Sequence, residues 1–231
     1  MVLRCSRWGF VSRRGWTKER PTKKPLIVLA GEDSSDRKIL RIFLEAVCSG
    51  ARGRIVEIND IVRLRDARDA AMGERITKLV GRIRARAERE QAEVACIFIH
   101  EDFDAIESSQ RETTRMRVQE ALNGRLVGVH YILATWEVEA WLLLFPDAIA
   151  AVNSSWVVPR RYRGVDTARI RDPKRVMKQA VSTVATSRYT ETDAPKIFEK
   201  VVELGLLNTL SGSNRSYSEL RQSASECCGT L

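Results

Sequence analysis

Short apolar runs alternate with amphipathic stretches through the first 145 residues of the chain. The β-branched run PLIVLAG at 25–31 predicts a strand buried on both faces, and SSDRKILRIFLEAV at 34–47 has the apolar spacing of a helix capped by serine. Further apolar runs at 51–58, 93–100 and 127–135 predict three more strands. The intervening stretches predict a long charged helix from Asp60 to about Glu90, a polar helix over 107–123 and an apolar helix over 136–145.

Strands that alternate with helices are typical of a parallel sheet with right-handed crossovers. The pattern therefore predicts an α/β fold of Rossmann-like type, with about four parallel strands flanked by helices. Beyond Pro146 no strong strand is predicted, and three short helices are expected near 173–183, 193–205 and 216–226. We expect an N-terminal tail over 1–24, an α/β domain over 25–150, and a helical extension over 151–231 packed on that domain.

The formal charge of +9 lies almost entirely in the tail. Residues 1–24 hold eight Lys or Arg against one acid, which leaves 31 basic and 29 acidic residues over 25–231. SRRGWTK resembles a twin-arginine export signal, but the charged ERPTKK follows where such a signal needs an apolar stretch, so export is not expected. A flexible solvated extension, an organellar transit peptide and a segment that stacks tryptophans on bases stay open as alternatives.

The cysteines and the hydropathy bear on the compartment. The five cysteines are odd in number and lack C-x-x-C spacing, which argues against a disulfide framework or a zinc site and favours a reducing, cytoplasmic location. No apolar run approaches the ~18 residues of a membrane span, so no membrane partner is expected. Whether the protein forms a homo-oligomer is left open.

Carboxylates gather where the predicted strands end. In an open parallel sheet these ends converge on the ligand site, and several carboxylates without His or Cys favour Mg²⁺ or Mn²⁺. We expect Glu32, Asp102 and Asp104 to bind such a cation for catalysis on phosphate esters, with Glu139 as an auxiliary catalytic residue. Asp102 and Asp104 are expected to point the same way in extended backbone. The alternative interpretation is that these acids are helix caps and solvated loop charges. The complete set is Glu32, Asp33, Glu101, Asp102, Asp104, Glu137 and Glu139.

With only two histidines, a histidine-based metal site is not expected. His100 is interpreted as a proton carrier or phosphate contact beside Asp102, or else as a polar strand-end residue. A basic stretch around 159–175 contains Tyr162 and is the preferred nucleic-acid contact, since arginine pairs with phosphate and tyrosine stacks on bases; a solvated loop is the alternative. Its predicted binding residues are Arg160, Arg161, Arg163 and Lys174.

Three motifs resemble a family of small bacterial Toprim-like proteins, related to nucleases of the overcoming-lysogenization-defect type. GEDSSDRKILRIFL is similar to the family's Glu-Gly-x-Ser/Thr-Asp/Glu opening, HEDFD to its His-x-Asp-x-Asp, and EVEAWLL to its Glu-Ala-Trp helix start. Asp33 departs from the pattern, which has glycine there. The resemblance covers roughly 26–225 and implies a Toprim-like fold and a metal-dependent nuclease of DNA or RNA, some members being encoded beside an ATPase that would be a partner. A receiver-like signalling domain and a Toprim scaffold that binds nucleic acid without catalysis are the alternatives.

Overall fold

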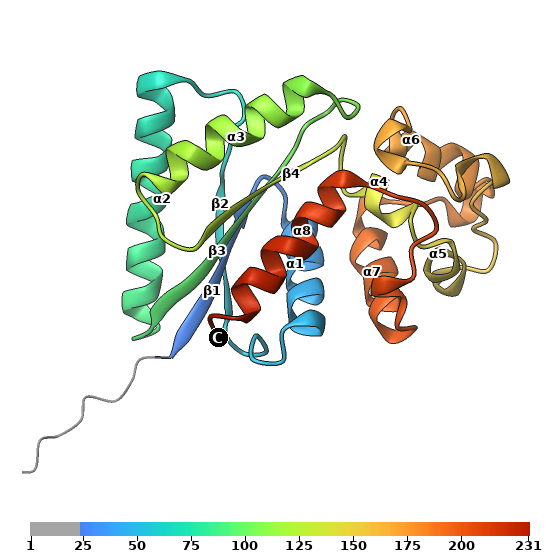
Figure 1. The fold of residues 1–231 in the computed structure, drawn as a ribbon. Coiled ribbons are helices and arrows are strands. Elements are labelled where there is room, and N and C mark those ends of the chain that lie inside the picture. Colours follow the sequence, from blue (N-terminus) through green and yellow to red (C-terminus); the bar gives the residue numbers. More distant parts are fainter. Residues whose placement is uncertain (1–23) are drawn as a thin grey trace, which may run out of the picture.

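The computed structural model describes residues 24–231 and has a four-stranded, all-parallel sheet at its centre (Figure 1). The strands are β1 (Pro25–Gly31), β2 (Ile55–Ile61), β3 (Glu93–Asp102) and β4 (Val129–Ala134), in the order β2-β1-β3-β4. The predicted α/β class and four-stranded sheet are confirmed. The predicted basic tail lies, except for Lys24, outside the described residues.

Alternate residues of the central strand β1 belong to two hydrophobic clusters, one on each face of the sheet. Ile27 and Leu29 pack in a cluster with residues of α1 (Ser34–Val47) and α8 (Arg215–Cys228). Leu26 and Val28 pack in the other cluster with residues of α2 (Asp69–Arg89) and α3 (Ser109–Asn123). Helices therefore cover both faces, which explains why β1 reads as a continuous apolar run.

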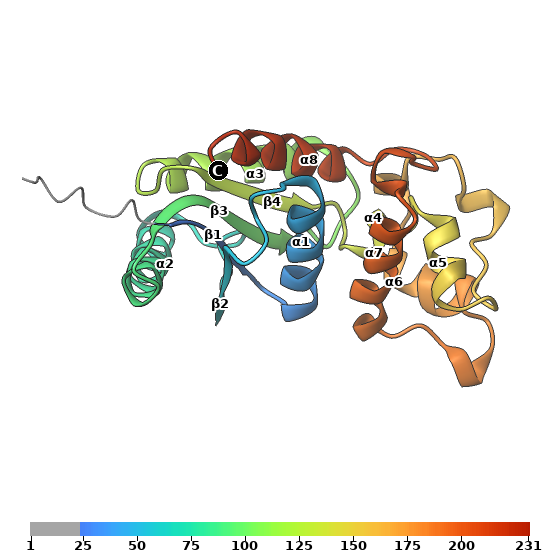
Figure 2. The ribbon, with the colours of Figure 1, turned by 90° about the horizontal axis from the view of Figure 1, so that it is seen from below.

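The C-terminal part is helical and gathers at one end of the molecule (Figure 2). It contains α4 (Glu139–Leu142), α5 (Pro146–Val152), α6 (Pro173–Val176) and α7 (Ala194–Glu203). A π-helical turn over Met177–Val181 continues α6. Ile197 and Phe198 of α7 belong to the same cluster as Phe43 of α1, so this part shares a core with the sheet. The three predicted C-terminal helices correspond to α6 with its π-helical turn, α7 and α8.

The long helix predicted from Asp60 begins nine residues later, at Asp69. Residues 59–61 continue β2, and 62–68 form a loop in which Leu64 is completely buried. The side chain of Glu101 accepts hydrogen bonds from the backbone N–H groups of Leu64 (2.6 Å) and Arg65 (2.9 Å). The carboxylate of Glu101 thus satisfies the backbone N–H groups of the loop, which need no helical hydrogen bonds. Leu64 can therefore be buried in a segment that is not helical.

The apolar helix predicted over 136–145 is shorter than expected. Only Glu139–Leu142 is α-helical, and Leu144 and Phe145 close tighter turns by donating to carbonyls three residues earlier. Pro146 then begins α5, as proline favours the first helical position. The apolar side chains from Ala140 to Phe145 are all buried, so the hydrophobic pattern predicted burial correctly and helix length wrongly.

Two disulfides correct the expectation from cysteine spacing. Cys48 pairs with Cys228 and Cys96 pairs with Cys227, with Cα atoms 5.2 and 5.9 Å apart, within the usual range for disulfides. The adjacent cysteines at the end of α8 reach two different elements, which spacing along the chain does not reveal. The inference of a reducing compartment from cysteine usage therefore loses its support. None of the helices within 24–231 is long and apolar enough to cross a membrane.

Candidate metal centre

Asp36, His100 and Asp102 lie together at the carboxyl end of the sheet. One potential donor atom from each lies within 4.8 Å of the others. His100 is completely buried, with Nδ1 3.3 Å from Oδ2 of Asp36 and Nε2 3.9 Å from Oδ1 of Asp102. The indole of Trp141 packs edge-on against the imidazole, at a centroid distance of 5.4 Å. The histidine is therefore held between two carboxylates, although a histidine in the metal site was not expected from the sequence.

The backbones of β1 and β3 approach each other closely at the end of β1. Gly31 pairs with His100 across the sheet, and a Cβ on Gly31 would lie 2.6 Å from the carbonyl oxygen of His100. That carbonyl also accepts a hydrogen bond from the N–H of Glu32. Asp33 then caps α1 in extended backbone, accepting from the N–H of Ser35 at 2.6 Å. Asp33 thus fits the turn without glycine, and α1 begins with Asp36 in its first turn, beside His100.

Three buried polar atoms in this group have no hydrogen-bond partner among the described residues. They are both ring nitrogens of His100 and Oδ1 of Asp102. Burial, followed by the charges of Asp36 and Glu139, raises the pKa of Asp102 well above its ordinary value. Because unpaired buried polar groups are costly, these atoms need a proton, a water or a cation between them.

Two further carboxylates approach from the segment after β4. Glu139 is buried, accepts a hydrogen bond from the hydroxyl of Tyr189 at 2.9 Å, and has its pKa raised to about 7, chiefly by burial. Glu137 is bound by Lys174 through both Nζ (3.0 Å) and the backbone N–H (2.7 Å). Burial nevertheless raises the pKa of Glu137. The negative charges of both glutamates raise the pKa of Asp102, so the three carboxylates interact electrostatically.

The structure does not bring Glu32, Asp102 and Asp104 together as a ligand set. Glu32 forms an ion pair with Nε of Arg63 at 2.6 Å, and Asp104 forms one with Arg65 at 2.7 Å. Asp104 has a φ of 58°, so the extended backbone needed for it to point with Asp102 ends before it. Its side chain is 66% exposed, against 25% for Asp102. Glu32 and Asp104 therefore lie at the rim as arginine partners.

The loop 62–68 presents these arginines, and Glu101 holds the loop. Burial raises the pKa of Glu101 to about 7, even though two backbone N–H groups stabilise its charged form. The charges of Asp104 and Asp66, with hydrogen bonds to both, raise the pKa of Arg65 despite its partial burial. Glu101 therefore has a structural role, because it holds the loop through two backbone N–H groups. Arg63 and Arg65 were not predicted from the sequence, since each reaches its acidic partner only through the fold.

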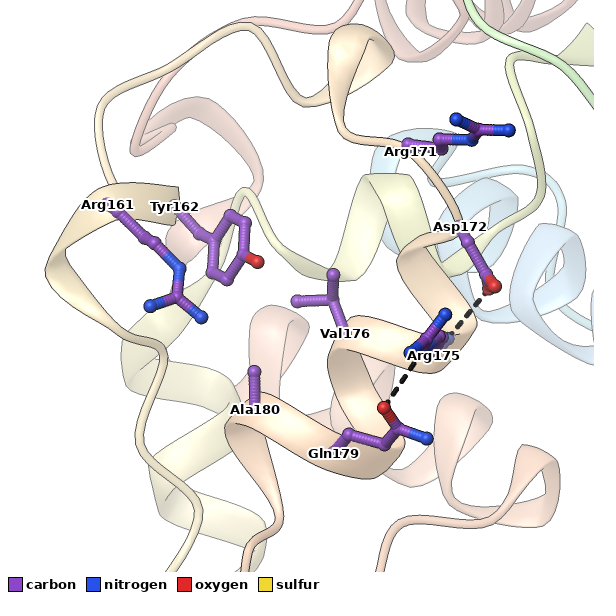
Figure 3. A pocket seen from close by; sticks show the side chains of 8 residues that line it. All are labelled: Arg161, Tyr162, Arg171, Asp172, Arg175, Val176, Gln179 and Ala180. Carbon is purple, nitrogen blue, oxygen red and sulfur yellow. Dashed lines mark hydrogen bonds between the residues drawn. The ribbon is translucent and has the colours of Figure 1, made fainter.

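The basic stretch divides into residues that are already paired and residues that face a cavity. Lys174 is bound to Glu137 and also lies 3.6 Å from Glu191, while Arg163 donates from Nε to the carbonyl of Val158. Arg160 is exposed, and Arg161 lines a cavity of about 670 Å³ (Figure 3). The residues that line this cavity are Arg161, Tyr162, Arg171, Asp172, Arg175, Val176, Gln179 and Ala180.

The donor set of the Asp36–His100–Asp102 group fits a divalent cation. Carboxylate oxygens favour Mg²⁺ or Mn²⁺, and an imidazole nitrogen is a common additional ligand for transition metals such as Mn²⁺. A cation would also give Oδ1 of Asp102 and Nε2 of His100 the partner that they lack. Comparison of the chain with protein-family models, curated proteins and solved structures gives no match.

Proposed function

We propose that the chain is a metal-dependent nuclease that hydrolyses phosphodiester bonds in DNA or RNA, with Mg²⁺ or Mn²⁺ as cofactor. The observation that carries the proposal is the buried Asp36–His100–Asp102 group, whose unpartnered atoms face one another at the carboxyl end of a parallel sheet. Ligands of open α/β sheets bind at that end. The nearby arginine-lined cavity supplies a second supporting feature, because nucleic acids are polyanions.

Asp36 and Asp102 would hold the cation together with His100, and Glu139 would serve as the auxiliary carboxylate. When bound, the cation neutralises charge that develops on a phosphate ester and lowers the pKa of a bound water. Nδ1 of His100 lies 3.3 Å from Oδ2 of Asp36, and Nε2 faces Asp102, so Nε2 is the ring nitrogen that would bind the cation. Tyr189 fixes the orientation of Glu139 through its hydroxyl.

A receiver-like signalling role is the weaker alternative. Such a domain uses one phosphoacceptor aspartate and a lysine from a fifth strand, whereas the described residues contain four strands and Lys174 comes from α6. The resemblance to Toprim-like proteins adds an ATPase as a partner to be tested.

The test is cleavage by the purified full-length chain of single-stranded DNA, duplex DNA and structured RNA, with Mn²⁺, Mg²⁺ or EDTA, and with any neighbouring ATPase present. We expect metal-dependent cleavage of at least one substrate, lost in Asp102→Asn. Asp60→Asn is the matched control, because Asp60 is exposed, pairs with Arg82 at 3.1 Å and does not belong to the Asp36–His100–Asp102 group. Cleavage that Asp102→Asn retains in full would contradict the proposal.

A further inference from the structure

Polar and apolar side chains together line the cavity beside α6. Figure 3 shows Arg161 and Tyr162 on one side, with Val176, Ala180 and the polar residues of α6 across from them. The guanidinium of Arg161 lies 4.8 Å from the centroid of the Tyr162 ring, a cation–π distance. A volume of about 670 Å³ lies within the roughly 300–1,000 Å³ typical of pockets for small molecules and cofactors.

Positively charged side chains outnumber acidic ones in the cavity lining. Among the described residues, Arg161, Arg171 and Arg175 form no ion pair, and Arg175 donates from Nε only to the side-chain oxygen of Gln179. The single acid in the lining, Asp172, is occupied in capping α6, where it accepts from the N–H of Arg175. The three guanidinium groups therefore present free donors to an anion, and arginine binds phosphate through paired N–H groups.

The apolar surface of the same cavity suits a flat aromatic group. The Tyr162 ring, Val176 and Ala180 contribute carbon surface between the arginines. Bases stack on aromatic side chains and on guanidinium planes, whatever the base. A phosphate next to an aromatic base is the composition of a nucleotide, so the arginines and the apolar surface of the lining match the two halves of one ligand.

The cavity adjoins the carboxylate group through α6. Lys174 lies between Asp172 and Arg175 in sequence, and its N–H and Nζ both bind Glu137. α6 therefore contributes residues both to the cavity and to the contact with Glu137.

We infer that this cavity binds one unpaired nucleotide, with its base beside Tyr162 and its phosphate on arginines of the lining, Arg171 among them. The inference rests on the proposed function, and it specifies single-stranded nucleic acid as the substrate class. A base in a duplex is stacked and paired, so only an unpaired or flipped base can enter a cavity. A free nucleoside phosphate has the same chemistry, and the experiment separates the two sources.

The experiment measures binding of the full-length chain to fluorescein-labelled single-stranded DNA, to the same sequence as duplex, and to AMP, all in EDTA. Tyr162→Ala should weaken single-strand binding about tenfold, while Tyr162→Phe, which keeps the ring, should leave it within about twofold. Arg171→Gln should reduce the salt slope of log K by about 0.7, the contribution of one single-strand phosphate. Arg169→Gln should not, because Arg169 pairs with Asp166 and lies outside the cavity.

Equal single-strand affinity for wild type, Tyr162→Ala and Arg171→Gln would overturn the inference, as would duplex binding as tight as that of the single strand. AMP binding with the same dependence on Tyr162 and Arg171, without strand binding, would assign the pocket to free nucleotides. Because these measurements contain no metal, they separate this inference from the proposed nuclease. Single-strand binding in EDTA without any cleavage would support the nucleotide pocket and contradict the proposed nuclease. Metal-dependent cleavage together with unchanged single-strand binding in Tyr162→Ala would support the nuclease and contradict the pocket.

Discussion

Nε2 of His100 lies 3.9 Å from Oδ1 of Asp102, and neither atom has a hydrogen-bond partner within residues 24–231. The distance is too long for a direct hydrogen bond and leaves room for a cation bound by both atoms. Both residues come from the end of β3, so the strand itself fixes their separation. The relationship makes Asp102 the residue at which metal binding and folding stability are most directly coupled.

Removal of the Asp102 charge should stabilise the metal-free protein and abolish its response to metal. Partial burial, followed by repulsion from Asp36, Glu139 and Glu137, disfavours the charged form of Asp102. Asp102→Asn should therefore raise the free energy of unfolding of the metal-free protein by roughly 1–3 kcal/mol. For a chain of this size that corresponds to about 2–4 °C in Tm for each kcal/mol. Thermal melts with and without Mn²⁺ measure both effects, with Asp60→Asn as control. Equal metal-induced shifts in wild type and Asp102→Asn would count against the site.

The sequence and the structure favour different ligand sets, and single variants separate them. The structure groups Asp36 with Asp102, whereas the strand-end pattern selected Glu32, Asp102 and Asp104. If the buried group is the centre, Asp36→Asn and Asp102→Asn should each remove nearly all cleavage, and the double variant should lose no more, because members of one ligand set act as a unit. Rates in Mn²⁺ for Asp36→Asn, Glu32→Gln and Asp104→Ala provide the measurement. Full activity in Asp104→Ala would exclude Asp104 from the mechanism.

The sheet and its first helix were predictable because their signals are local. The strand at 25–31 and the helix at 34–47 match the structure residue for residue, since the apolar runs lie within those segments. The predicted serine cap is wrong, because Asp33 caps the helix. The start of α2 was not predictable, because Glu101 holds loop 62–68 from a strand more than 30 residues away. The place of Asp36 beside His100 depends likewise on how β1 lies against β3. Strand-end carboxylates indicated the region of the site, and the tertiary fold selected its members.

The two disulfides should contribute substantially to stability. They close loops with sequence separations of 180 and 131 residues, and cross-links over such distances restrict the unfolded chain by about 4–5 kcal/mol each in the entropic model. Reduction should therefore lower Tm and free α8 from β3 and from the end of α1. Alkylation under denaturing conditions, followed by mass spectrometry, should label four more thiols after reduction. An unchanged count would mean that the purified chain does not form these bonds.

The basic tail should add salt-dependent affinity for nucleic acid without carrying the chemistry. Residues 1–24 hold eight basic side chains against one acid, while the carboxylates proposed for catalysis all follow Pro25. If the tail binds phosphates, a chain starting at Pro25 should bind duplex DNA with a shallower slope of log K against log salt, by about 0.9 for each phosphate that the tail neutralises in the full-length chain. Cleavage at low salt should persist, because all residues of the proposed metal centre are retained. Binding isotherms at several salt concentrations compare the two chains. Indistinguishable slopes would show that the tail is a passive extension.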